Sequence, residues 1–220
     1  ELFMAQYLVF VGAIVMLVGV LSYTRETLRG TTKPNRVTWL LWSIAPLIGT
    51  AAAFSDGVRL ATLPVFITGV APLIVFIASF VNKNAYWKLE KSDYFCGAVS
   101  IFALIIWQIT DNPVTAISFA IISDALAALP TLIKSWRFPE TESGEAYTTA
   151  IFGNATSFFA LKTGSFSEWA FPIYLVTINI VIAFAVYRKK FMKKHSVMRM
   201  NFCIIDPYLK QPNVIAREDL

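Results

Sequence analysis

The stretch NPVTAISFAIISDALAALPTLI, residues 112–133, contains one charged residue, Asp124, among otherwise apolar and small polar side chains. A helix needs about 20 consecutive, mostly apolar residues to cross the hydrocarbon core of a bilayer. The stretch is long enough for that crossing. It therefore predicts a transmembrane helix that carries a single carboxyl group near its middle.

Six more runs lack Asp, Glu, Lys and Arg, and the whole chain is 56% hydrophobic and 15% charged. They are residues 2–24, 37–55, 60–82, 94–110, 146–161 and 169–187. Soluble domains carry about 25% charged residues. Together with 112–133 these runs predict an all-α membrane protein with seven transmembrane helices, in which 94–110 and 146–161 are short for a span.

Basic residues gather in alternate connections, which predicts the orientation of the chain. One set comprises Arg25, Arg29, Lys33, Arg36, Lys83, Lys88, Lys91, Lys134, Arg137, Arg188, Lys189, Lys190, Lys193 and Lys194. The opposite connections hold Arg59 and Lys162. Because cationic loops stay in the cytoplasm during insertion, we expect an integral protein of the plasma (inner) membrane with its N-terminus outside and its C-terminus inside.

An internal repeat divides the expected membrane domain, residues 1–187. A shift of 108 residues lays the first three runs on the last three without a gap and pairs Trp39 with Tyr147 and Pro64 with Pro172. Repeat one covers about 2–82, a linker helix about 94–110, and repeat two about 112–187. Residues 188–220 form a basic cytoplasmic tail, expected to be mostly irregular from His195 onward because it is polar and contains Pro207 and Pro212.

The segment LPTLIKSWR, residues 129–137, precedes an acidic, Ser-rich loop and another predicted helix. It resembles the PQ-loop motif of the SWEET and PQ-loop transporter superfamily, and the resemblance extends over residues 8–187. The corresponding segment of repeat one, residues 22–29, lacks the proline. The resemblance implies two parallel three-helix bundles, joined by a linker helix, that rock around a central solute site.

Asp124 is the first candidate for a functional residue, because an ionised carboxylate inside a membrane is costly and usually faces a cavity or a partner. It can bind a proton that couples transport to a gradient, or it can balance a cationic group of the substrate. A third reading makes it a buried hydrogen-bonding residue.

Asn154 and Asn179 carry amides that can hydrogen-bond a polar solute near the membrane midplane. In sugar-carrying members of the resembled family an asparagine on the third helix of each repeat lines the site; Asn179 is near that position, whereas repeat one has Ala71 there. Asparagines also join membrane helices to one another, so both readings stay open.

Trp39 and Trp42 lie one helical turn apart and present two indoles on one face. Trp42 is the deeper residue and the candidate for stacking on a ring of the solute. For Trp39 we expect an interfacial anchor, because tryptophans concentrate at membrane surfaces.

Prolines inside membrane helices free a carbonyl group and permit bending. Pro46, Pro64, Pro72, Pro130 and Pro172 are therefore candidate hinges, with static kinks as the alternative.

These features predict a transporter that moves a small polar solute, such as a sugar, vitamin, nucleoside or amino acid, by alternating access. The alternative is a seven-helix receptor or scaffold that binds a ligand without moving it. We expect no enzyme, no cofactor, no metal and no nucleic-acid partner, since His195 is the single histidine and the basic residues lie in membrane-flanking loops. Proton coupling and a homo-oligomer are both open.

Overall fold

The computed structural model of the chain describes residues 2–55, 63–110, 113–160 and 166–205. This part contains seven α-helices and no strand, which confirms the all-α class. The helices are α1 Leu2–Arg29, α2 Arg36–Ser55, α3 Leu63–Ala78, α4 Lys91–Gln108, α5 Pro113–Arg137, α6 Gly144–Thr156 and α7 Phe166–Ile205. Short 3-10 helices follow α3 (η2, Lys83–Ala85), α5 (η3, Pro139–Thr141) and α6 (η4, Ser157–Ala160).

Three helices in the described residues are long and apolar enough to cross a membrane: Leu8–Arg29 of α1, Ile117–Arg137 of α5 and Trp169–Arg188 of α7. A shorter apolar helix, Phe66–Ala78, belongs to α3. These segments indicate a membrane protein. Their outward side chains agree with that environment, since Phe10, Ile14, Ile122 and Phe184 are about half exposed or more.

The chain divides into two compact units, Glu1–Val186 and Tyr187–Leu220. Helix α7 continues to Ile205, so the expected irregular structure from His195 onward is wrong for residues 195–205. No proline or glycine occurs between Pro172 and Pro207, so nothing in that interval forces the helix to end. All further observations concern the first unit.

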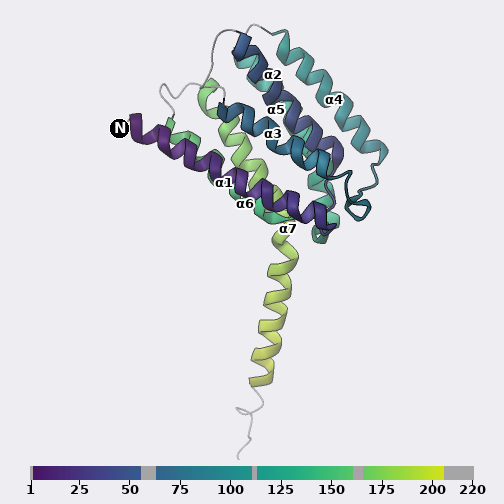
Figure 1. Cartoon of the computed structure of the whole chain (residues 1–220). Helices are drawn as coiled ribbons and strands as arrows, with labels where there is room; N and C mark the ends of the chain where they lie inside the picture. Colours follow the sequence, from purple (N-terminus) through teal and green to yellow (C-terminus); the bar gives the residue numbers. More distant parts are fainter. Residues whose placement is uncertain (1, 56–62, 111–112, 161–165, 206–220) are drawn as a thin grey trace, which may run out of the picture. The chain divides into compact units, whose positions relative to one another are not determined.

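Within the first unit, α3 packs against α1 and α2, and α5 packs against α2 and α4 (Figure 1). Helix α1 also packs closely along α6, where glycines remove the side chains that would separate the two backbones. A Cβ atom at Gly153 of α6 would lie 2.8 Å from the carbonyl oxygen of Gly12 of α1. The α1–α6 contact therefore depends on glycine.

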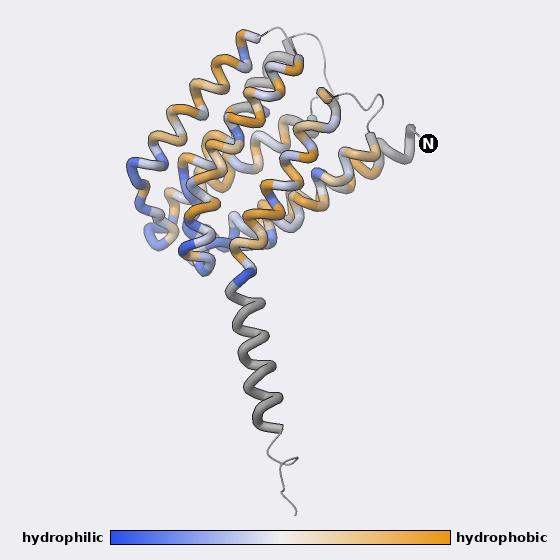
Figure 2. The backbone as a smooth tube through the Cα atoms, turned by 180° about the vertical axis from the view of Figure 1, so that it is seen from behind, coloured by the Kyte–Doolittle hydropathy of each residue, from blue (hydrophilic) through white to orange (hydrophobic). Residues whose placement is uncertain are grey.

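Hydrophilic residues gather at one end of the helices in the first unit, whereas their middle parts are mainly hydrophobic (Figure 2). The loops that follow α1, α3 and α5 meet at that end. Lys33 N–H donates to the Thr141 carbonyl (2.9 Å), Asn82 Nδ2 donates to the Leu28 carbonyl (2.9 Å), and the ring centroids of Trp87 and Phe138 are 5.5 Å apart. We call this the charged end. The three loops thus lie together, and their place on one side of a membrane stays a prediction.

Candidate functional site

Asp124 lies on α5, inside a helix that is apolar and long enough to span a membrane. Its side chain is partly buried, and its Oδ2 accepts a hydrogen bond of 2.6 Å from the Tyr174 hydroxyl of α7. The Trp42 indole of α2 lies beside the same carboxylate, although its buried Nε1 has no hydrogen-bond partner in normal geometry. Three helices thus bring a carboxylate, a phenol and an indole together.

An aromatic row leads from this carboxylate toward the charged end. The ring of Trp42 meets that of Trp39 edge-on at 5.5 Å, and the Trp39 ring lies 4.7 Å from the Tyr23 ring of α1. Trp39 is only 3% exposed, so its expected role as an interfacial anchor is wrong. Hydropathy could not reveal this, because one side of Trp39 faces Tyr23, which lies on another helix.

Asn154 and Asn179 each bond their own helix. Asn154 Nδ2 donates to the Ala150 carbonyl (2.8 Å), and Asn179 Nδ2 donates to the Leu175 carbonyl (2.8 Å). Both side chains are partly buried, and their amide oxygens keep the capacity to accept a bond. Among the described residues these amides bond their own helices and not Asp124, so their place beside it stays a prediction.

The candidate hinges occupy different positions in their helices. Pro46, Pro130 and Pro172 lie inside α2, α5 and α7, where each removes a backbone hydrogen bond. Pro64 is the second described residue of α3 and adjoins residues 56–62, which lie outside the described residues, so its role as a hinge stays a prediction. Pro72 is the internal proline of α3.

A second polar cluster, which the sequence did not indicate, lies at the charged end around Glu142. Its Oε2 accepts hydrogen bonds from the hydroxyls of Tyr23 (2.8 Å) and Tyr147 (2.9 Å), and its Oε1 forms an ion pair with Lys134. Tyr23 and Tyr147 are 0% and 2% exposed, and Lys134 is 2% exposed. We call these four residues the Glu142 cluster.

The Glu142 cluster is charge-balanced and joined to the backbone. Lys134 Nζ also donates to the carbonyl of Lys33, in the loop between α1 and α2, and lies 5.1 Å from the centroid of the Trp87 ring. Two opposite charges buried this deeply persist because each satisfies the other and both have further hydrogen bonds. The cluster was missed because Glu142 lies in a loop and bonds Tyr23 from 119 residues away.

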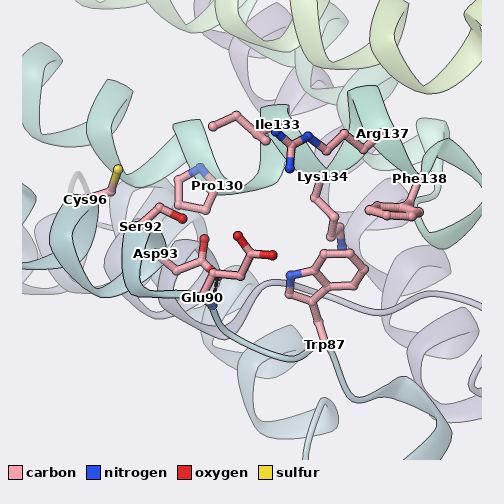
Figure 3. A pocket seen from close by; sticks show the side chains of 10 residues that line it. All are labelled: Trp87, Glu90, Ser92, Asp93, Cys96, Pro130, Ile133, Lys134, Arg137 and Phe138. Atoms are coloured by element: carbon pink, nitrogen blue, oxygen red, sulfur yellow. Dashed lines mark hydrogen bonds between the residues drawn. The ribbon is translucent and has the colours of Figure 1, made fainter.

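The described residues form a small pocket near the charged end, between the start of α4 and the end of α5 (Figure 3). Trp87, Glu90 and Asp93 line one part of it, and Lys134 and Arg137 line another. Its volume of about 40 Å³ suits a few water molecules at most, whereas the pockets that hold drug-sized ligands measure roughly 300–1,000 Å³. This pocket does not include Asp124.

Among the residues that the structure describes, no group of three or more His, Cys, Asp or Glu side chains is placed to hold a metal ion. Cys96 is a free thiol on α4. The Asp124 site and the Glu142 cluster bring together acidic and basic side chains, phenols and indoles.

Tyr174 is the other residue that sequence reasoning did not select. The 108-residue shift pairs it with Phe66, so a hydroxyl present in the second repeat and absent from the first was the available signal.

No protein-family model, no curated protein and no solved structure matches this chain. What the chain does must follow from the residues themselves.

Proposed function

We propose that this chain is an integral membrane transporter that moves a small polar solute by alternating access between two three-helix bundles. The observation that carries the proposal is the Asp124 carboxylate, which lies within a membrane-capable helix and contacts Tyr174 of α7 and Trp42 of α2. Ionisable groups inside membrane helices commonly mark solute or proton pathways. The carboxylate, phenol and indole offer charge, hydrogen bonds and a stacking surface for one solute.

The packing of the helices supports the two-bundle arrangement. In the sequence, a shift of 108 residues lays α1 on α5 and α2 on α6. If the two repeats are related by a two-fold axis, the contact between α1 and α6 must therefore have a counterpart between α5 and α2. Both contacts are present, and α3 joins α1 to α2 within the first bundle. Asp124 then lies where the second bundle, through α5 and α7, meets α2 of the first.

The proposed test is a thermal-shift screen of the purified protein against sugars, nucleosides, vitamins and amino acids at two pH values. A ligand that binds the folded state raises the free energy of unfolding, by about 2.7 kcal/mol when its concentration is 100 times its Kd. The melting temperature rises accordingly. We expect at least one ligand to stabilise the protein, and we expect Asp124→Asn to lower the affinity for that ligand at least tenfold. If the carboxylate takes up the coupled proton, the variant should also change the pH dependence of ligand binding. Asn179→Ala tests the predicted second contact.

Ser118→Ala is the matched control, because Ser118 is another polar residue of α5 and bonds the Val114 carbonyl of its own helix. It should leave the ligand shift unchanged. A hit that survives Asp124→Asn undiminished contradicts the proposed site. No hit across the panel favours the receptor or scaffold alternative, whereas a hit must be followed by flux into proteoliposomes.

A further inference from the structure

The Glu142 cluster connects the two proposed bundles through one carboxylate. Tyr147 lies five residues from Glu142 in the second repeat, so its hydrogen bond is local. Tyr23 lies on α1 of the first repeat and reaches the same Oε2 atom, at 2.8 Å against 2.9 Å for Tyr147. Two buried phenols therefore make nearly equal bonds, of which one crosses between the repeats and the other does not.

Further bonds cross between the repeats at the same end. Lys134 Nζ donates to the Lys33 carbonyl, Lys33 N–H donates to the Thr141 carbonyl (2.9 Å), and Ser22 Oγ donates to Glu145 Oε2 (2.5 Å). Thr38 Oγ1 adds a buried bond of 2.7 Å to the Ala127 carbonyl. Residues 22–38 are thus joined to residues 127–145 at several points around the buried ion pair.

Alternating access requires the bundles to separate at one end while they remain closed at the other. Separation at the charged end would break the crossing bonds and admit water to Glu142 and Lys134. The bonds of Glu142 to Lys134 and Tyr147 would stay intact, because all three residues belong to the second bundle. We infer that the Glu142 cluster is the gate that closes the charged end of the solute path. The inference rests on the proposed function.

The two tyrosines provide the test. An interaction shifts a conformational equilibrium only if it differs between the two states. Tyr23→Phe removes a bond that exists in the closed state alone, so it should favour opening. Tyr147→Phe removes a bond present in both states, so it should lower overall stability without favouring either one.

The measurement is amide hydrogen exchange of the segment 31–36 in the purified full chain, since the Lys33 N–H is held by the Thr141 carbonyl across the gate. Exchange of this amide in Tyr23→Phe should accelerate by about ten- to a hundredfold, which is the range expected for a lost hydrogen bond to a charged group. In Tyr147→Phe it should change less than about twofold. Peptides from α4 should exchange in both variants at the same rate as in the wild-type protein.

Ser22→Ala is a second variant for the case in which Tyr23→Phe does not fold. It removes a crossing bond at an exposed position and should accelerate the same amide by a smaller factor. Equal acceleration in Tyr23→Phe and Tyr147→Phe would overturn the gate, and so would no acceleration in either Tyr23→Phe or Ser22→Ala.

The exchange experiment uses no solute, so it separates the gate from the proposed function. If exchange accelerates but no compound in the thermal-shift screen binds, the charged end opens in a protein that does not transport those solutes. Unchanged exchange together with an Asp124-dependent ligand would keep the proposed function and remove the gate.

Discussion

At the scale of single residues, the buried ion pair between Lys134 and Glu142 has a large expected effect on stability. Removing one member of a buried pair leaves the other charge unpaired, which costs about 3–5 kcal/mol. We expect Lys134→Met and Glu142→Gln each to lower the thermal stability of the purified protein strongly. The double variant should recover most of the loss, because no uncompensated charge then remains and the glutamine oxygen still accepts from the tyrosines.

Unfolding in detergent measured for all four proteins of this double-mutant cycle checks the expectation. If the loss of unfolding free energy in the double variant equals the sum of the losses in the two single variants, the two charges act independently. The pair would then contribute nothing through its mutual contact.

At the scale of the helices, the approach of α1 to α6 depends on Gly153. Its added Cβ would meet Met16 and the backbone oxygen of Gly12, the latter at 2.8 Å, and a backbone atom cannot rotate away. Gly153→Ala should therefore destabilise the protein by about 1–3 kcal/mol, the usual cost of overpacking. The melting temperature in detergent measures this.

Gly97→Ala on α4 is the matched control, because its Cβ would meet the Val37 methyl group at the same 2.8 Å. That contact is with a side chain on a partly exposed residue, which can shift. The two substitutions should differ clearly, and equal losses would show that the α1–α6 seam is no tighter than the α2–α4 contact.

The helices themselves could be predicted from the runs without charge, because lipid and protein interior both select apolar residues over the length of a span. The Asp124 site was predictable in part, since one carboxylate in an apolar run is conspicuous in the sequence. Its partner Tyr174 and the burial of Trp39 depend on which helices meet, and single-helix patterns do not contain that information. The Glu142 cluster depends on a loop that is brought to α1 by the tertiary fold.

At the scale of the whole molecule, the gathering of the basic loops at one end makes the proposed orientation testable. In a chain with Cys96→Ser and Cys203→Ser, single cysteines can replace Lys88, in the loop after α3, and Gln108, the last residue of α4. Both positions are exposed. With the positive loops in the cytoplasm, an impermeant maleimide should label Gln108→Cys on intact cells and Lys88→Cys only after permeabilisation.

Labelling of both variants in permeabilised cells is the control for reactivity. The reverse pattern on intact cells would invert the proposed topology and place the Glu142 cluster at the outer surface. The gate would then close toward the opposite compartment.

The pairing of α4 with α5 bears on how the protein is made. Ser100 Oγ and Ser123 Oγ each donate to the backbone carbonyl of the other residue, at 2.8 and 2.9 Å, in a buried position. Helix α4 has 18 residues and is not among the three membrane-capable helices described, whereas α5 is. A short helix with a buried hydroxyl is costly in lipid by itself. If α4 is the membrane span that the sequence predicts, we expect it to insert together with α5 as one arm of a helical hairpin, because α5 supplies the carbonyl and hydroxyl groups that satisfy Ser100.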